Sequence, residues 1–368
     1  MRVALFVPAP FDRVSGGYGY DRRIVAELRA AGHEVSVAEL NGVFPLADAA
    51  ARAAARAAWE RLEPDQHPVI DGLALPAFLG LEDAFAAPDE HALPATDAPA
   101  LPAPDAHALP ARAITGLIHH PVSMETGLDE TDRRALDAAE RRLLPRLHRM
   151  LVTSETTGET LATRFAIPAG RIRVIVPGTD EAPRRAGSGV LGREIVSVGT
   201  LIPRKGHDLL LRALARLFDL DWRLTIVGSP EADPAHAHGL MALAGELAIA
   251  HRVRFAGELV GEDLERVWRG ADLFALATRY EGYGMAIAEA LKRGLPVVVT
   301  NGGAAGHLVT PESGCVCPVD DRDQLSKSLR RLIFGDELRA EMAEAAWRVG
   351  RSLPSWSAQG ALFAAALA

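Results

Sequence analysis

The chain has 368 residues, which is longer than one hydrophobic core usually supports, so two domains are expected. Its 48% hydrophobic and 24% charged residues are typical of a soluble globular protein. A formal net charge of −8 argues against nucleic acid as a partner, because phosphate binding needs a basic face.

The two cysteines, Cys315 and Cys317, are separated by one residue. A disulfide at this spacing would be strained, and no cluster of cysteine and histidine surrounds them as a zinc site requires. We therefore expect free thiols in a reducing cytoplasm. The first residues turn polar too early for a signal peptide, and no apolar run approaches about 18 residues. A cytoplasmic protein is expected, with a peripheral contact to the inner membrane face left open.

The first half of the sequence predicts the opening of a doubly wound α/β sheet. Residues 2–8 form an apolar run typical of a buried parallel strand, a glycine-rich turn follows at 15–20, and residues 21–32 have helical periodicity. Further elements of the same alternation are expected at 33–40 (strand), 50–62 (helix), 68–75 (strand), 113–120 (strand), 129–149 (helix), 149–154 (strand) and 171–180 (strand and turn).

Residues 86–112 interrupt this alternation. Prolines recur every few residues, and the pentapeptide HALPA occurs at 91–95 and again at 107–111. Proline at this density excludes a regular helix or a central strand. We expect an extended excursion on the surface of the N-terminal half.

A second run of strands and helices begins after residues 181–193, whose proline, glycine and serine are typical of a linker. The expected division is a domain at 1–182, a second at 190–350 and a C-terminal segment at 351–368. Strands are expected at 194–199, 222–228, 252–257, 271–277 and 295–300, and helices at 207–218, 235–249, 262–269, 285–293, 323–333, 337–349 and 356–367. This is an α/β fold of two Rossmann-like domains facing across a cleft, with ligands expected beyond the carboxyl ends of the strands.

The loop at 199–210 places Arg204, Lys205 and Gly206 at a helix N-terminus. Free backbone N–H groups and the helix dipole favour an anion there, and two added cations favour a diphosphate. A solvated basic loop is the alternative.

The stretch at 279–299 carries Glu281 in a glycine-rich turn and Glu289 in the helix that follows. Carboxylates at these places can accept hydrogen bonds from sugar hydroxyls, whereas they would repel phosphates. Taken alone, the two glutamates are equally explained as ordinary loop and helix acids.

Two further loops carry candidate residues. Gly16 and Gly17 allow close approach of a ligand to the backbone, but the stretch lacks the G-x-G-x-x-G spacing of a dinucleotide site, so no NAD is expected. His119 and His120 end a strand, with no third metal ligand nearby in the sequence. Either a structural or a functional role fits them.

Together these loops resemble the retaining GT-B glycosyltransferases of family 4. The resemblance is strongest at 195–320 and rests on Glu281 and Glu289 with seven residues between them, together with the R-K-G loop. The segments GGYGYDRRIVAELRAAGHEV (16–35) and VIVPGTD (174–180) agree with it. The resemblance implies that the first domain binds the acceptor, that the second binds a nucleotide sugar, and that the C-terminal helix packs back on the first domain.

The same resemblance implies roles for individual residues. Arg204 and Lys205 would hold the diphosphate, Glu289 the ribose hydroxyls and Glu281 the hydroxyls of the donor sugar. The residues implied to bind the donor are Gly16, Gly17, Thr200, Arg204, Lys205, Gly282, Tyr283, Gly284, Met285 and Glu289. Those implied to be catalytic are His119, Glu281, Lys205 and Arg204, and those assigned to the acceptor side are Tyr18, His120 and Glu125.

The sequence departs from the family pattern in places, and the match of one residue is left open. Many relatives have arginine where Thr200 stands, and the loop 301–307 lacks the acid that many relatives carry. His119 matches the histidine that such enzymes place near the donor sugar, with His120 the alternative match.

The implied reaction is transfer of a hexose from a UDP- or GDP-linked sugar to a hydroxyl acceptor, with retention at the anomeric carbon. The acceptor hydroxyl would approach on the face that the diphosphate leaves, and a phosphate oxygen would take its proton. No metal and no cofactor are implied, and the acids at 320–325 are interpreted as helix caps. A nucleotide-sugar epimerase, a phosphorylase and a binding protein without turnover are the alternatives. The arginine-rich segment 133–150 could contact anionic lipids or be a solvated surface helix.

Overall fold

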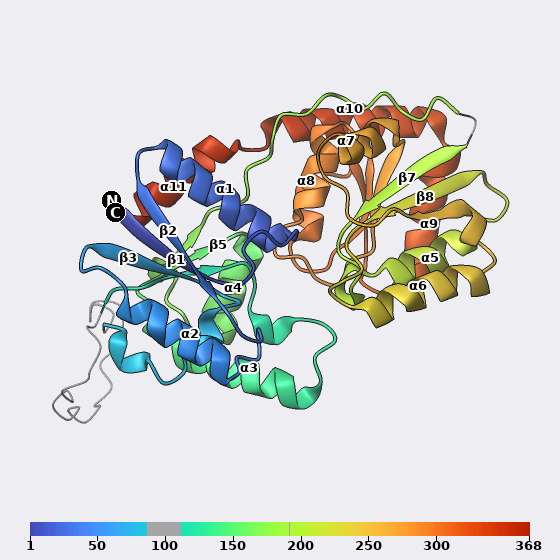
Figure 1. The fold of residues 1–368 in the computed structure, drawn as a ribbon. Coiled ribbons are helices and arrows are strands. Elements are labelled where there is room, and N and C mark those ends of the chain that lie inside the picture. The colour runs from blue at the N-terminus through green and yellow to red at the C-terminus, as the bar shows by residue number, and fades with distance from the viewer. Residues whose placement is uncertain (87–111, 191) are drawn as a thin grey trace. The chain divides into compact units, whose positions relative to one another are not determined.

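The computed structural model describes residues 1–86, 112–190 and 192–368, and the chain forms two compact α/β units (Figure 1). The first unit comprises Met1–Pro177 together with Trp356–Ala368, and the second comprises Gly178–Ser355. The proline-rich excursion expected at 86–112 falls, except for its two end residues, outside the described residues. Those ends are joined, since the Ala86 amide donates to the Arg112 carbonyl at 2.9 Å.

The first unit is built on a parallel sheet with the strand order β2-β1-β3-β4-β5-β6. Its strands are β1 (Arg2–Pro8), β2 (Glu34–Leu40), β3 (Gln66–Asp71), β4 (Thr115–Ile118), β5 (Arg149–Val152) and β6 (Ile172–Val174). In β1 every residue from Val3 to Pro8 is buried, as a central parallel strand covered on both faces requires. β1 lies between β2 and β3, so the sheet grows outward from the chain's first strand.

The helices of the first unit are α1 (Gly16–Ala30), α2 (Ala49–Glu60), α3 (Glu130–Leu143), α4 (Glu155–Arg164) and α11 (Trp356–Leu367). The first four begin at side chains that accept a hydrogen bond from the backbone of the first turn, namely Ser15, Asp48, Asp129 and Ser154. α11 packs against α1, where a Cβ on Gly360 would lie 2.4 Å from the Cβ of Glu27. Glycine is therefore required for the two helices to approach this closely.

The second unit has a parallel sheet with the order β12-β11-β10-β7-β8-β9. Its strands are β7 (Arg193–Val198), β8 (Trp222–Val227), β9 (Val253–Phe255), β10 (Leu273–Leu276), β11 (Val297–Thr300) and β12 (Gly314–Cys317). β7 and β10 are neighbours at the centre of the sheet, so the loops that follow them leave the same edge. β12 carries both cysteines, which are free thiols as expected.

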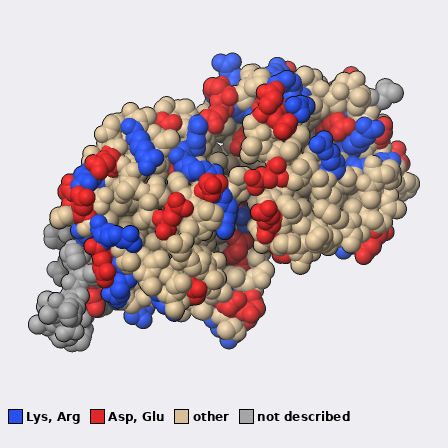
Figure 2. Space-filling view, viewed as in Figure 1, with Lys and Arg blue, Asp and Glu red and all other residues tan. Residues whose placement is uncertain are grey.

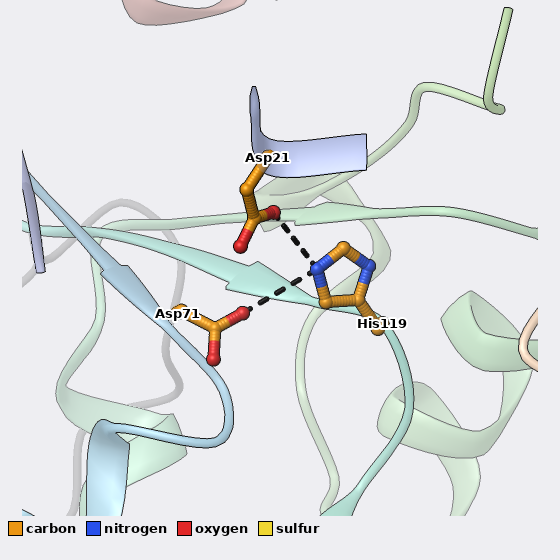
Figure 3. A group of neighbouring side chains, drawn as sticks. All are labelled: Asp21, Asp71 and His119. Carbon is orange, nitrogen blue, oxygen red and sulfur yellow. Dashed lines mark hydrogen bonds and ion pairs between the residues drawn. The ribbon is translucent and has the colours of Figure 1, made fainter. Parts of the chain in front are cut away.

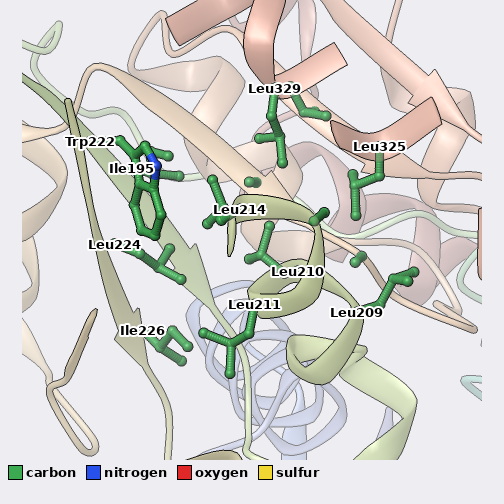
Figure 4. Close-up of a cluster of buried hydrophobic side chains, with 14 of the residues drawn as sticks. Ile195, Leu209, Leu210, Leu211, Leu214, Trp222, Leu224, Ile226, Leu325 and Leu329 are labelled. Carbon is green, nitrogen blue, oxygen red and sulfur yellow. The ribbon is translucent and has the colours of Figure 1, made fainter. Parts of the chain in front are cut away.

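The helices of the second unit are α5 (His207–Ala215), α6 (Pro234–Glu246), α7 (Gly261–Gly270), α8 (Met285–Lys292), α9 (Arg322–Phe334) and α10 (Asp336–Ser352). One core cluster joins the sheet to α5 and α9 through residues such as Ile195, Leu210 and Leu329 (Figure 4). A second cluster on the other face includes Phe274 and Leu291 and buries α8. The helix N-termini that matter below are thus held by packing on both sides of the sheet.

Several boundaries differ from the sequence-based expectations. The glycine-rich stretch expected as a turn at 15–20 lies largely within α1, which begins at Gly16 and not at residue 21, because Ser15 caps the helix there. The segment 181–193 is part of the second unit, because its backbone bonds to other elements of that unit: the Arg185 amide donates to the Arg293 carbonyl, and the Ser188 amide donates to the Asp272 carboxylate. The helix expected at 129–149 ends at Leu143, and Pro145 lies in the short 3₁₀ turn that follows it. Proline cannot donate the next helical hydrogen bond, which accounts for the shorter helix.

The surface is charged with both signs. On the face shown in Figure 2, Lys and Arg are interspersed with Asp and Glu over the described residues, in keeping with the net charge of −8. Within the part of the chain that the structure describes, no helix is long and apolar enough to span a bilayer.

Candidate active site

The loop after β7 is shaped by Gly206. Residues Pro203–Lys205 form one 3₁₀ turn, and Gly206 then adopts φ +64° before α5 begins. A Cβ on Gly206 would lie 1.9 Å from the carbonyl oxygen of Ala277, the residue after β10. Glycine is thus required twice, for its left-handed backbone and for the close approach of two loops.

This approach brings Arg204, Lys205 and Glu281 together in the second unit. Lys205 Nζ lies 2.6 Å from Glu281 Oε1, and Arg204 Nη1 lies 3.7 Å from the same oxygen. The Thr278 hydroxyl also donates to that oxygen at 3.1 Å. Glu281 is buried, and burial alone would raise the pKa of its carboxyl, but Lys205 and Arg204 outweigh this effect and hold the pKa below its usual value. The carboxylate is therefore ionised and shared between two cations.

Arg279 holds this cluster in place and was not identified from the sequence. Its guanidinium makes two parallel bonds to the Asp208 carboxylate, at 3.0 and 2.9 Å, and its Nε donates to Asp320 at 3.0 Å. Its backbone amide donates to the Arg204 carbonyl at 2.7 Å. Arg279 therefore ties the loop after β7 to the loop after β10 and to the start of α9.

The turn before α8 ends at Gly284, which adopts φ +103°. Glu281 fixes the start of this turn, because its amide donates to the Gly302 carbonyl and its own carbonyl accepts from the Ala304 amide. Tyr283 is buried, Gly282 is half-buried, and Met285 begins the helix. The first amides of α8 thus lie at the end of the turn that Glu281 begins, and the amides of a helix N-terminus favour an anion.

Glu289 lies on α8 with a carboxyl group that is bonded to no protein group within the described residues. Its neighbour Arg293 is engaged elsewhere, with Nη2 2.6 Å from Glu265. Desolvation raises the pKa of Glu289 to about 7, because Arg293 only partly offsets it and Asp180 and Glu265 add to it. A partly buried, unpartnered carboxyl group of this kind is a suitable acceptor for ligand hydroxyls.

In the first unit, His119 lies between two buried aspartates (Figure 3). Its Nε2 is 2.9 Å from Asp21 Oδ1 and 3.4 Å from Asp71 Oδ2. Asp71 ends β3, and Asp21 comes from α1 and was missed in the sequence analysis. Gly17 lies against the imidazole, where a Cβ would be 3.3 Å from Cδ2. Gly17, expected to admit a ligand, thus lies in the first turn of α1 and makes room for the ring of His119.

Asp21, Asp71 and His119 are, among residues 1–86, 112–190 and 192–368, the group whose oxygen and nitrogen atoms lie close enough to hold a metal ion. The 2.9 Å between Nε2 and Asp21 is a hydrogen-bond distance, with a proton between the two atoms. The acids at 320–325 serve the structural roles expected of them, since Asp321 caps α9 by accepting from the Gln324 amide at 2.9 Å.

The residues assigned to the acceptor side are all bonded to other protein groups, one to the backbone and two to each other. Tyr18 is buried, and its hydroxyl donates to the Pro8 carbonyl at 3.0 Å. His120 Nε2 lies 3.3 Å from Glu125 Oε2, so this histidine pairs with Glu125 rather than with the aspartates around His119. The two histidines are therefore in distinct environments.

The remaining predicted donor residues are Gly16, which begins α1, and Thr200, which follows β7. Thr200 is half-buried, and its carbonyl accepts from the Ile202 amide at 2.9 Å, which tightens the turn that leads to Arg204.

Family models match both halves of the chain. Residues 20–183 match Glycosyltransferase Family 4, and residues 180–349 match Glycosyl transferases group 1. A D-inositol 3-phosphate glycosyltransferase from Mycobacterium sp. (strain JLS) is 37% identical over 170 residues. That match covers 43% of this chain and 38% of the relative, so the chain matches well under half of the relative's length.

Solved structures are similar in fold over the whole chain. Sucrose-phosphate synthase from Thermosynechococcus elongatus has a TM-score of 0.79 at 18% identity, covering 99% of this chain and 97% of that one. Anabaena HepE in complex with UDP-glucose has a TM-score of 0.75 at 16% identity, covering 100% and 99%. The predicted α/β fold class of the GT-B type is confirmed by these neighbours and by the two six-stranded parallel sheets. The chain therefore belongs to the glycosyltransferases of family 4, group 1.

Proposed function

We propose that this protein is a retaining hexosyltransferase that moves a sugar from a UDP- or GDP-linked donor to a hydroxyl acceptor without a metal ion. The observation that carries the proposal is the cluster of Arg204, Lys205 and Glu281 between the N-termini of α5 and α8. Two cations beside two helix N-termini suit a diphosphate, and the carboxylate among them suits a neighbouring sugar hydroxyl. The second unit then binds the donor, and the first unit takes the acceptor.

The diphosphate is expected to recruit Lys205 and Arg204, which already lie side by side and need no long rearrangement. These cations and the amides of Gly282, Tyr283 and Gly284 stabilise negative charge that develops on the leaving phosphate. Charges fixed before the reaction lower the barrier because they need not reorganise during it. The nucleotide bound by HepE, named above as a UDP-glucose complex, supports a donor of this class.

Glu289 is assigned to the ribose hydroxyls. Burial removes the hydrogen bonds that water would make to this carboxyl, and no group of the described residues replaces them. Hydrogen bonds from two ligand hydroxyls would replace those that water made. A ligand that supplies these bonds gains affinity at little cost elsewhere. A ribose, with its adjacent hydroxyls, fits this requirement.

Glu281 is assigned to hydroxyls of the transferred sugar rather than to proton transfer. Its pKa is lowered by Lys205 and Arg204, which makes it a weak base at neutral pH. The C–O bond to the diphosphate breaks as the acceptor oxygen bonds to the anomeric carbon on the same face. The acceptor proton passes to a phosphate oxygen of the departing nucleoside diphosphate, so no protein base is consumed.

The test uses the full chain with UDP-, GDP- and ADP-linked sugars, each with a panel of hydroxyl acceptors. D-inositol 3-phosphate belongs in the panel because a relative is named for it. We expect one nucleotide to raise the melting temperature, transfer to persist in EDTA, and NMR of the product to show the anomeric configuration of the donor. Inversion of that configuration, or loss of transfer in EDTA, would contradict the proposal.

The same assay separates the alternatives. An epimerase converts the donor without an acceptor, a phosphorylase needs only orthophosphate, and a silent binding protein shows the thermal shift without any product. Each of these results would replace the transferase assignment.

For the segment 133–150, contact with a membrane surface and a solvated surface helix are the two alternatives. We favour the solvated surface helix. Half of the six arginines there pair with acids of the protein: Arg134 with Glu130, Arg141 with Asp137 and Arg142 with Glu82. We therefore expect weak co-sedimentation with anionic vesicles that fades as salt is raised.

A further inference from the structure

The two ring nitrogens of His119 have different surroundings. Nε2 faces the carboxylates of Asp21 and Asp71. Nδ1 lies on the other side of the ring, away from both carboxylates (Figure 3), and within the described residues no protein group bonds to it. About a fifth of the side chain, 19%, is exposed. One nitrogen is thus fixed by the protein, while the other is left for a ligand.

The two aspartates need a cation, and His119 supplies it. Asp21 is 2% exposed and Asp71 is 3% exposed, so their charges are largely out of water. The Arg22 guanidinium, next to Asp21 in the sequence, donates instead to the carbonyls of Phe11 and Arg13. Two buried carboxylates with no cation between them would repel each other and lose hydration. An imidazolium that donates through Nε2 relieves both effects.

The ring of His119 is also held from its other sides. Tyr20 meets it edge-on with ring centroids 5.3 Å apart, and the Tyr20 hydroxyl is itself fixed by the Ile175 carbonyl at 3.0 Å. The backbone carbonyl of His119 accepts from the hydroxyls of Thr153 and Thr157, both at 3.2 Å. The direction of the Nδ1–H bond is therefore set before any ligand arrives.

We propose that Asp21 and Asp71 are positioning residues that keep His119 as an imidazolium, so that its Nδ1–H is a permanent hydrogen-bond donor to a substrate oxygen and not a general base. This inference deepens the transferase function proposed above and rests on it for the identity of the substrate. The protonation state itself can be measured without any substrate.

The electrostatics around the ring agree with this assignment. Burial alone would lower the pKa of His119, but Asp21 and Asp71 outweigh it, and the pKa is raised. Burial, with a smaller contribution from Asp71, raises the pKa of the Asp21 carboxyl to about 6 although His119 lowers it, so this carboxylate is mostly ionised above pH 7. The other charged or titratable groups that face the cluster are Arg22, which lowers the pKa of Asp21, Tyr20, whose pKa burial raises, and Tyr18, whose pKa burial also raises, so that it is neutral at physiological pH. Among these neighbours only the carboxylates favour the charged ring.

The first test is NMR of the imidazole nitrogens in the full-length protein between pH 6 and 8.5. We expect His119 to stay doubly protonated throughout in the wild type, and to titrate within this range in Asp21→Asn and in Asp71→Asn. His67 is an internal control, because burial lowers its pKa and it should be neutral over the same range. A wild-type His119 that titrates near pH 6.5, or variants that do not change its titration, would overturn the proposal.

The second test is the pH dependence of transfer in the same variants. In a variant that lacks one carboxylate, His119 loses its proton as the pH rises through the lowered pKa of the imidazole. Above that pKa, KM for the substrate should rise by up to about tenfold per pH unit, with a smaller change in kcat. In the wild type, KM should not rise with pH over this range. A uniform loss of activity at every pH, with normal folding by circular dichroism, would instead indicate a purely structural role and overturn the proposal.

Two outcomes distinguish this inference from the function on which it rests. If the NMR result is as expected and no transfer is found with any donor, the aspartates still set the charge of His119 and only the transferase assignment fails. If zinc or manganese alone broadens or shifts the His119 resonances in the wild type at stoichiometric concentration, the three side chains form a metal site and the positioning role fails.

Discussion

Lys205 and Glu281 form an ion pair, with Nζ 2.6 Å from Oε1, although they are 76 residues apart in the sequence. The cation assigned to the donor diphosphate is thus partly neutralised by the carboxylate assigned to the donor sugar. A diphosphate arriving at this site must compete with Glu281 for Lys205. Removing the charge of Glu281 should therefore affect nucleotide binding and sugar transfer in opposite ways.

Glu281→Gln is expected to leave UDP or GDP affinity unchanged or up to about tenfold tighter, because Lys205 and Arg204 are released, while transfer falls by at least about 100-fold. Isothermal titration with the nucleotide and an assay with the nucleotide sugar measure the two effects. Lys205→Met is the matched control, in which nucleotide affinity itself should fall. Weaker nucleotide binding by Glu281→Gln would argue against the assignment of the diphosphate to this pair. Alanine at 281 is a poorer probe, since it leaves two half-buried cations without their anion and costs stability.

Glu289→Gln is expected to stabilise the protein at alkaline pH while weakening nucleotide binding. The folded carboxyl has a pKa of about 7 against a usual 4.5, so the folded state binds more protons between these values and loses stability as pH rises through that window. The loss is about 2–3 kcal/mol above pH 7 and is absent in glutamine. Chemical denaturation at pH 5 and pH 8 checks this, with equal stabilities at pH 5 and a more stable variant at pH 8. Equal stabilities at both pH values would contradict it.

Gly206→Ala is expected to cost at least about 2 kcal/mol and to lower donor affinity, because the new Cβ meets the Ala277 carbonyl and the backbone is left-handed. Gly239→Ala is the matched control: it lies exposed in α6, with no atom within 4 Å of the new Cβ, and should stabilise by about 0.5–1 kcal/mol. Thermal denaturation and nucleotide titration report both effects. A tolerated alanine at 206 would show that the two loops can separate without loss.

Arg279→Lys is expected to reduce kcat/KM for the donor and to destabilise by about 1–2 kcal/mol, because lysine cannot reproduce the two parallel bonds to Asp208. Arg330→Lys removes a similar two-bond pair with Asp219, but on the exposed surface, and should change stability by less than about 0.5 kcal/mol. Steady-state kinetics and melting curves compare the two. Equal behaviour of the two variants would mean that Arg279 does not hold the donor loops.

The sequence predicted the parts of this structure that depend on neighbouring residues. Apolar runs located the central strands, and the glycine at 206 located the start of α5, because both signals are local. Asp21 and Arg279 were not identified, since their partners lie 98 and 71 residues away and no periodicity relates them. β12 was not assigned as a strand because its four residues are too short a run to be distinguished from a loop.

The segment 181–193 shows why residue composition alone did not predict its structure. Its composition was that of a linker, but composition reports side chains, and this segment is held by its backbone amides, which donate to the carbonyls of Arg293 and Arg269. Backbone hydrogen bonds of this kind leave no trace in residue type.

The contact between Trp356 and Tyr20, with ring centroids 5.8 Å apart, has a consequence for the order in which the protein matures. Tyr20 flanks His119, and Trp356 begins the helix that completes the first unit. On the ribosome, the N-terminal half emerges first, but it lacks the helix that packs against α1 until residues 356–368 have been synthesised. The second unit, whose residues are contiguous, can fold earlier. The half translated first is therefore the half that matures last, and His119 acquires its full surroundings only at the end of synthesis of this region.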